Sequence, residues 1–199
     1  MITKFSGNNL WFVSDTHFGH RGIIQFCNRP FATVEEHDKT LIDNWNSVVG
    51  LKDTVFHLGD FCYGNPAKMK EYRNQLNGHI ILIKGNHDDR LMNKACEELF
   101  DYVTYQMKII IDGKVVFLNH FPFLCFEHDN PDVYTDGTLM YSLFGHVHSR
   151  PNNTSYDAQR LTMCYPTQYD VGVDNNYFTP ISWENVNKKI QEQISNWHK

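Results

Sequence analysis

The sequence predicts an α/β fold, with strands and helices alternating in the first half and a second group of strands after them. Three short apolar runs have the length of buried strands and lie at 10–13, 53–58 and 80–83. Segments with helical spacing of apolar residues separate these runs, which is the pattern of βαβ units and a parallel sheet. Further on, Asp112-Gly113 between two apolar runs predicts a β-hairpin.

The helices of the first half have recognisable beginnings. Thr33 followed by Glu36 has the spacing of a capping box and begins one helix. Asn65-Pro66 supplies an N-cap and a first-turn proline for a second helix, which is expected to reach Leu76. A third helix is predicted over 89–99.

The second half is predicted to consist mainly of β-strands followed by one helix. Ser182 is a typical N-cap for that helix, whose apolar residues recur on one side as far as Trp197. No internal repeat or linker interrupts the chain, so residues 1–199 are expected to form one domain. The strands of this half are predicted at 103–111, 114–118, 139–144 and 170–173.

The composition argues against several classes of protein. With 41% hydrophobic residues and a net charge of -5, the chain should fold compactly and should lack the basic face of proteins that bind long nucleic acid. It has neither an apolar run near the roughly 20 residues of a membrane span nor an N-terminal signal pattern. The 5 cysteines are widely spaced, which is typical of free thiols. We therefore expect a cytoplasmic protein without a membrane partner.

Side chains of the metal-ligand type follow five of the predicted strands. Each group by itself is also explained by a hydrogen-bonded turn or a solvated loop. Their recurrence is informative, because the carboxyl ends of parallel strands gather at one edge of a sheet. Carboxylate, amide and imidazole groups suit Mn²⁺, Fe or Zn²⁺ better than a thiolate-rich structural zinc site. The groups are Asp15 with His17, Asp60, Asn86 with His87, His120, and His146 with His148.

These motifs, in their order and spacing, resemble the full signature of the calcineurin-like metallophosphoesterases. The signature spans residues 15–148, and Arg29-Pro30-Phe31 nearby is similar to the small single-domain bacterial and phage members. The resemblance implies a four-layer αββα sandwich of two mixed sheets flanked by helices. The matching motifs are Asp15-x-His17, Gly59-Asp60, Gly85-Asn86-His87-Asp88, His120 and Gly145-His146-x-His148.

The resemblance also implies two divalent metal ions, of which Mn²⁺ is favoured and Fe, Zn²⁺, Ni²⁺ and Co²⁺ are alternatives. A hydroxide that bridges the two ions would attack phosphorus in line, and both ions would neutralise charge on the phosphoryl oxygens. Asp60 would bridge the ions. The first ion would be held by Asp15, His17, Asp60 and His148, and the second by Asp60, Asn86, His120 and His146.

His87 corresponds to the non-ligand histidine of the family. It is expected to act as general acid toward the leaving oxygen, or as donor to a phosphoryl oxygen, with a structural role as the alternative. Asp88 is expected to orient the His87 imidazole as part of the catalytic pair. Four residues near the motifs are candidates for substrate contacts, although surface salt bridges explain arginines equally well. They are His20, Arg29, Arg90 and Arg150.

The function predicted from these observations is hydrolysis of phosphodiester bonds in a small substrate, including nucleotides and cyclic nucleotides. Only the segments 121–139 and 149–168 are long enough to shape the site, and a shallow site favours diesters. Residues 61–64 follow Asp60 where the Ser/Thr-phosphatase relatives carry an arginine, which argues against a protein phosphatase. The alternatives are a phosphomonoesterase for a small metabolite or nucleotide, a non-catalytic scaffold of the same fold, and a structural zinc protein.

Overall fold

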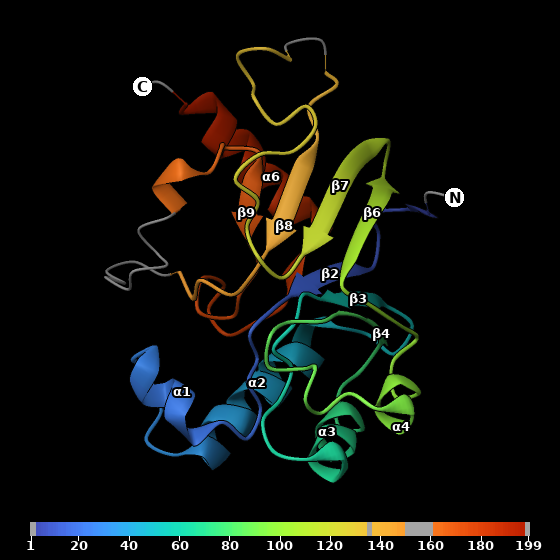
Figure 1. Ribbon diagram of the computed structural model, residues 1–199, viewed down its shortest axis with the longest axis vertical. Coiled ribbons are helices and arrows are strands. Elements are labelled where there is room, and N and C mark those ends of the chain that lie inside the picture. The colour runs from blue at the N-terminus through green and yellow to red at the C-terminus, as the bar shows by residue number, and fades with distance from the viewer. Residues whose placement is uncertain (1–2, 135–136, 150–160, 198–199) are drawn as a thin grey trace.

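The computed structural model in Figure 1 describes residues 3–134, 137–149 and 161–197. Within these residues the strands form two five-stranded sheets. The first sheet has the order β10 (Ile181–Ser182), β2 (Leu10–Val13), β3 (Thr54–His57), β4 (His79–Ile83) and β5 (Tyr102–Thr104). The second has the order β1 (Thr3–Phe5), β6 (Gln106–Ile111), β7 (Lys114–Asn119), β8 (Tyr141–Phe144) and β9 (Gln168–Asp170).

Both sheets are mixed. In the first sheet β2, β3, β4 and β5 run parallel, and only β10 is antiparallel to its neighbour. In the second sheet β6 and β7 form the predicted antiparallel hairpin, whereas β1 with β6, β7 with β8, and β8 with β9 are parallel pairs. The carboxyl ends of β2, β3 and β4 therefore lie at one edge of the first sheet, and those of β7 and β8 at one edge of the second.

The helices lie against the sheets. They are α1 (Arg21–Phe26), α2 (Val34–Val48), α3 (Pro66–Arg73), α4 (Lys94–Glu97), the 3₁₀ turn η1 (Leu161–Met163) and α6 (Trp183–Ser195). In Figure 1 helices α1 to α4 lie on one side of the first sheet and the second sheet lies on the other. Trp45 of α2 and Met69 of α3 share a buried cluster with Val55 and Ile80 of that sheet. The α/β sandwich of two mixed sheets with helices is thus confirmed.

Helix α6 belongs to a second buried cluster, which lies between the sheets. The Trp183 ring lies 6.2 Å from the ring of Phe12 in the first sheet and 6.2 Å from that of Tyr141 in the second. Burial of such aromatic side chains supplies much of the driving force for packing the two sheets. Among the described residues, no helix combines the length and the apolar character required to cross a membrane.

The predicted helix caps are confirmed. The Thr33 hydroxyl accepts a hydrogen bond from the Glu36 backbone N–H at 3.2 Å. The Glu36 carboxylate reaches back to the backbone N–H of Ala32 at 2.9 Å, one residue earlier than a capping box requires. Asn65 and Ser182 cap α3 and α6 in the same way, each accepting from the backbone N–H three residues on.

Several predicted elements are wrong in extent. The single strand predicted over 103–111 divides at Tyr105, because β5 pairs with β4 in the first sheet whereas β6 pairs with β7 in the second. The helix predicted over 89–99 shrinks to α4, because the Asn93 side chain accepts from the Cys96 backbone N–H and sets a new start. Helix α3 ends at Arg73, and β9 covers 168–170 where 170–173 was predicted. The elements β1, α1 and β10 were not predicted.

Candidate metal centre

The seven predicted metal ligands come together where the two sheet edges meet, and Asp60 lies among them. Its Oδ2 is 3.4 Å from His17 Nε2 and 3.6 Å from His120 Nε2. The same carboxylate thus faces a histidine from the turn after β2 and one from the end of β7. This is the position that a ligand shared by two ions requires.

The other predicted ligands lie on either side of Asp60. Asp15 Oδ1 is 3.9 Å from His148 Nε2, and the rings of His17 and His148 stack with centroids 5.2 Å apart. Asn86 Oδ1 is 3.1 Å from His120 Nε2, and the His120 and His146 rings lie 5.2 Å apart. Among the seven predicted ligands, two groups of three have ligand atoms within 4.8 Å of one another, namely Asp15, His17 and His148, and Asp15, Asp60 and His120.

The backbone is left-handed at most of these positions. Such φ values are unfavourable for residues with a Cβ and cost about 1 kcal/mol or more each. The surrounding fold must impose them, which is characteristic of functional sites. The residues are Asp15, His17, Asp60, His146 and His148, with φ between 47° and 70°.

Two glycines allow the ligand loops to approach one another closely. A Cβ at Gly85 would lie 2.3 Å from Asp60 Oδ1, and a Cβ at Gly145 would lie 1.9 Å from Ser14 Oγ. Neither glycine has a positive φ. The glycine of the Gly85-Asn86-His87-Asp88 turn is therefore needed for the space beside Asp60.

The chemistry of the cluster fits a bound cation. Asp15 Oδ1 and His17 Nε2 are buried and find no hydrogen-bond partner among the described residues, which is costly unless another ligand satisfies them. Burial, together with nearby His148 and Arg29, holds the pKa of His17 well below its usual value, so its lone pair is available. Burial and the Asp15 charge raise the pKa of Asp60, which means that its ionised form is unfavourable here. A bound divalent cation would stabilise that ionised carboxylate.

Asp174, which the sequence analysis missed, supports His148. The His148 Nδ1–H donates to Asp174 Oδ2 at 2.8 Å and leaves Nε2 toward the centre. Burial alone would lower the pKa of His148, but the Asp15 and Asp174 carboxylates raise it well above its usual value. Asp174 follows the strand predicted at 170–173, so the same strand-end rule that identified Asp15 and Asp60 would have found it.

Arg29 is the partner of Asp174, and the prediction that it contacts substrate is wrong. Its side chain is fully buried and donates to both carboxylate oxygens of Asp174 at 3.0 and 2.7 Å. It also donates to the backbone carbonyls of Asp15 and Thr16. Burial would raise the pKa of Asp174, but the Arg29 guanidinium and His148 hold it well below its usual range. Arg29 therefore connects the loop that carries Asp15 to Asp174, the residue that holds His148.

The suggestion that Asp88 orients His87 is also wrong. The Asp88 side chain is fully buried, and both of its carboxylate oxygens accept hydrogen bonds from the backbone. The donors are the N–H groups of Asp60 and Gly85 at 2.8 Å and of Phe61 at 3.0 Å. Asp88 thus fastens the Asp60 loop to the Asn86 loop. Burial raises its pKa to about 6 despite these donors.

Of the other three residues predicted to contact substrate, His20 and Arg90 lie in different places relative to the metal ligands. His20 Nδ1 lies 3.3 Å from His17 Nδ1, and burial, with nearby His87 and Arg29, lowers the pKa of His20 to about 4. Arg90 is exposed, and its Nη2 lies 3.1 Å from His87 Nδ1. His87 Nε2 in turn is 3.9 Å from Asp60 Oδ2. Arg150 lies outside the described residues.

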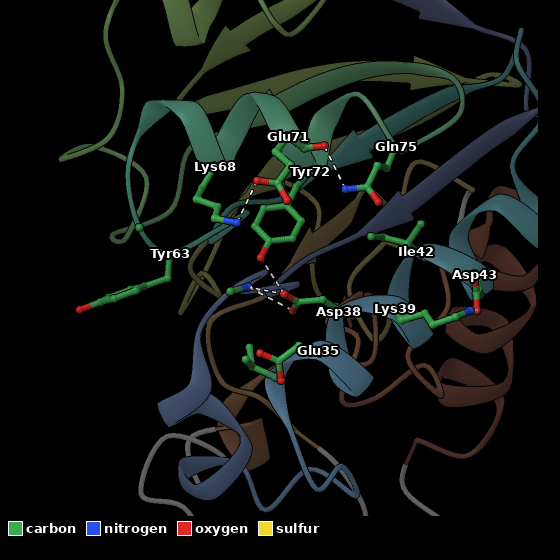
Figure 2. A pocket seen from close by; sticks show the side chains of 13 residues that line it. Glu35, Asp38, Lys39, Ile42, Asp43, Tyr63, Lys68, Glu71, Tyr72 and Gln75 are labelled. Carbon is green, nitrogen blue, oxygen red and sulfur yellow. Dashed lines mark hydrogen bonds and ion pairs between the residues drawn. The ribbon is translucent and has the colours of Figure 1, made fainter.

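A groove of about 710 Å³ lies beside the centre, between α2 and α3 (Figure 2). Gly19 and Tyr63 belong to its lining, and in Figure 2 the Tyr63 ring points away from the Asp38–Tyr72 pair. Four carboxylates outnumber two lysines in the lining, and each lysine already pairs with a carboxylate. The charged lining residues are Glu35, Asp38, Lys39, Asp43, Lys68 and Glu71.

A two-sheet α/β sandwich with a His/Asp cluster where the strands end defines a candidate metal-dependent hydrolase. The model of the calcineurin-like phosphoesterase superfamily domain matches residues 9–167. The chain therefore belongs to the calcineurin-like phosphoesterase superfamily.

The chain is also similar to individual proteins. The gene 66 protein of Mycobacterium phage L5 is 34% identical over 166 residues, which are 71% of this chain and 78% of that protein. The uncharacterized protein MJ1445 of Methanocaldococcus jannaschii is 53% identical over 85 residues, 42% of this chain and 48% of that protein. The crystal structure of AQ665 from Aquifex aeolicus, a protein of unknown function, aligns with a TM-score of 0.67 and 27% identity over 90% of this chain and 97% of that chain.

Proposed function

We propose that the protein hydrolyses phosphodiester bonds in small substrates, such as nucleotides or cyclic nucleotides, with two divalent metal ions. The observation that carries this proposal is the clustering of the seven ligand-type side chains, with His17, His120 and the non-ligand His87 within 3.9 Å of Asp60 Oδ2. A non-catalytic scaffold has no need for a histidine that is not a ligand at that position. Mn²⁺ is the favoured ion.

The residues divide into two ligand sets in this proposal. Only two of the seven ligands are carboxylates, so two divalent ions leave the centre net positive and attractive to a phosphoryl group. The bound ions supply activation of a water molecule and neutralisation of phosphoryl charge. One set is Asp15, His17, Asp60 and His148, and the other is Asp60, Asn86, His120 and His146.

His87 acts on the substrate in this proposal. Its side chain is 34% exposed, so a substrate can reach it, whereas His17 and His120 are buried. The backbone N–H of His87 donates to Asp60 Oδ1 at 2.8 Å and fixes the residue against the centre. Nε2 then faces the phosphoryl group, as general acid or as hydrogen-bond donor.

A short diester is favoured as the substrate for two reasons. The acidic lining of the groove between α2 and α3 repels a polyanion, and the chain carries a net charge of -5, so long nucleic acid is disfavoured. An exposed aromatic residue lies beside the centre, because Phe121 is 44% exposed and its ring centroid lies 4.6 Å from that of His146. Its free surface suits a base or another aromatic group of a diester. The free cysteines fit a cytoplasmic location.

The test compares two chromogenic substrates on metal-free protein reloaded separately with Mn²⁺, Fe²⁺, Zn²⁺, Ni²⁺ or Co²⁺. Bis(p-nitrophenyl) phosphate should be hydrolysed faster than p-nitrophenyl phosphate, and a panel of nucleotides and cyclic nucleotides should then identify the substrate. Turnover of monoesters alone would reverse the preference for diesters. Absence of turnover with either substrate, in protein that contains two ions per chain, would favour the scaffold.

A further inference from the structure

We propose that Arg90 binds a second phosphate of the substrate, and that the preferred substrate is therefore a short diester with a terminal phosphate on one of its ester groups. This inference rests on the proposed phosphoesterase function and narrows its substrate class. It ranks a short linear nucleotide with a terminal phosphate above a cyclic nucleotide, which has only one phosphate. The sequence alone left two explanations for Arg90, a substrate contact and a surface salt bridge.

The salt-bridge explanation finds no partner in the part of the chain that the structure describes. Asp89, the adjacent residue, accepts from the Tyr105 hydroxyl at 2.8 Å and pairs with Lys84 at 3.0 Å. Among the described residues no carboxylate forms an ion pair with Arg90, which is exposed. The charge of Arg90 is therefore available to an anion from solution.

Aromatic contacts hold the Arg90 guanidinium beside the metal centre. Its central carbon lies 4.8 Å from the centre of the Tyr63 ring, and that ring stacks on His20 with centroids 4.5 Å apart and an angle of 11°. The His20 ring lies in turn 5.3 Å from the ring of His17, a predicted ligand. This stack restricts the rotamers of Arg90, so less conformational entropy is lost when its N–H groups bind a phosphate.

One full edge of the guanidinium remains free for a phosphate. Arg90 Nη2 lies 3.1 Å from His87 Nδ1, and this contact uses at most one N–H group. The two N–H groups of Nη2 point to different edges of the planar guanidinium, so one edge keeps a pair of parallel donors. Paired donors of this geometry fit two oxygens of a phosphate.

The position of Arg90 relative to His87 sets the spacing of the two phosphates. His87 Nε2 lies 3.9 Å from Asp60 Oδ2 and faces the phosphoryl group that reacts in the proposed function. Arg90 lies on the opposite side of the same ring, next to Nδ1. The second phosphate is thus separated from the first by an imidazole ring and its hydrogen bonds. A nucleotide chain can span this separation, whereas the directly linked phosphates of a pyrophosphate cannot.

The charge of the neighbouring groove favours a phosphate at the end of the substrate over one within a longer chain. Tyr63, which carries Arg90 on its ring, also belongs to the lining of the groove between α2 and α3 (Figure 2). Carboxylates outnumber lysines in that lining, so a polyanion that continued past Arg90 into the groove would be repelled. A substrate that ends in a phosphate at Arg90 avoids this repulsion.

The first experiment measures binding and needs no turnover. Calorimetry with the protein loaded with Mn²⁺ compares thymidine 5′-monophosphate with thymidine 3′,5′-bisphosphate, whose two phosphates have the spacing of neighbours in a chain. The bisphosphate should bind about tenfold more tightly, the effect of one charge-assisted contact. Arg90→Met should remove this difference, whereas Arg90→Lys, which keeps the charge but not the paired donors, should keep part of it.

The matched control for the binding experiment is Arg21→Met. It makes the same change at another exposed arginine, which begins α1, and it should keep the full difference between the two ligands. Equal binding of both ligands by the wild type, an unchanged difference in Arg90→Met, or an equal loss in Arg21→Met would overturn the proposal.

The second experiment measures turnover of the dinucleotide thymidylyl-thymidine without a terminal phosphate, with one on its 5′ oxygen and with one on its 3′ oxygen. One of the two phosphorylated forms should have a KM about tenfold below that of the unphosphorylated form, and this advantage should shrink as the salt concentration rises. The informative quantity is the ratio of kcat/KM between these substrates, because a general loss of turnover through the contact with His87 cancels in it. Arg90→Met should reduce the ratio to about one.

The two experiments separate this inference from the proposed function. Equal kcat/KM for all three dinucleotides in the wild type would overturn the role of Arg90 and leave the diesterase function intact. Tighter binding of the bisphosphate that depends on Arg90, in a protein that hydrolyses no diester, would contradict the proposed function and support the contact between Arg90 and phosphate.

Discussion

The two halves of the candidate metal centre are held in place by different means. In the proposed ligand sets, Asp15, His17 and His148 make up the first half, Asn86, His120 and His146 make up the second, and Asp60, which lies near both His17 and His120, would be shared. In the first half, His148 is fixed by the buried carboxylate of Asp174, which is paired in turn with Arg29. In the second half, His120 Nδ1 donates to the backbone carbonyl of Leu58 at 2.7 Å, and Asn86 is exposed.

This difference predicts how ion binding and stability in each half respond to the loss of a supporting side chain. Buried charges fix the first half, and removal of one member leaves another charge without a partner in a region of low dielectric. In the second half a neutral backbone carbonyl fixes the His120 ring, and Asn86 is accessible to solvent and substrate. We therefore expect the first half to bind its ion more tightly and to be coupled to the stability of the fold, and the second half to exchange its ion readily.

The largest effect is expected for Asp60→Asn, which removes the ligand that the halves share. Loss of the bridging charge should release both ions and remove several kcal/mol of charge stabilisation, which lowers kcat/KM by about a thousandfold or more. Elemental analysis and the diester assay measure the two effects. Asp101→Asn, in an exposed pair with His79, is the control. Retention of both ions would exclude Asp60 as the shared ligand.

The next effect tests the first half through Asp174→Ala. Affinity for one ion should fall by about 10- to 100-fold, the usual result of removing the partner of a ligating histidine. The free energy of unfolding should fall by about 3–5 kcal/mol, because Arg29 is left buried and unpaired. Calorimetric metal titration and urea unfolding measure these quantities. The double variant Arg29→Met/Asp174→Ala should recover stability but not metal affinity, and an equal loss at both ions would contradict the comparison.

His57, fully buried at the end of β3, predicts a pH dependence of stability. Gly59 N–H donates to His57 Nδ1, so His57 Nε2–H must donate to Thr16 Oγ1 at 2.9 Å. Burial lowers the pKa of His57 to about 3 from 6.5, so the unfolded chain binds more protons between these values. The stability present above pH 6.5 is therefore lost as the pH falls, by up to about 1.4 kcal/mol per pH unit.

The measurement is urea unfolding of metal-free protein at pH 7, 6 and 5. Asp88, with its pKa raised to about 6, acts in the opposite direction, so the informative quantity is the difference between the wild type and His57→Gln. The variant should lose less stability on acidification. The exposed His79→Gln serves as control, and equal slopes in the wild type and His57→Gln would rule out this role of His57.

The smallest effect on stability is expected in the second half. Asn86→Ala should reduce the metal content from two ions to one while it changes the free energy of unfolding by less than about 0.5 kcal/mol, because the side chain is exposed. Metal analysis after dialysis and urea unfolding measure both. A stability loss comparable to that of Asp174→Ala would show that the two halves are supported alike.

The sequence by itself determined the groups that lie around Asp60 and most of the strands and caps. This was possible because those features are local. A ligand-type residue directly after an apolar run has its position fixed by that strand, and a cap is fixed by the residue three positions on. The extent of the strand at 103–111 was not local, since the two sheets compete for its two parts.

The tertiary structure alone decided which residues support that centre. Arg29 and Asp174 are 145 positions apart, and Asp88 acts on backbone groups 27 and 28 positions away. Nothing in the neighbouring sequence distinguishes a buried arginine that pairs with a carboxylate from an exposed one that could bind phosphate. Burial and partner are properties of the packed chain, and they gave Arg29 and Asp88 contacts different from those predicted.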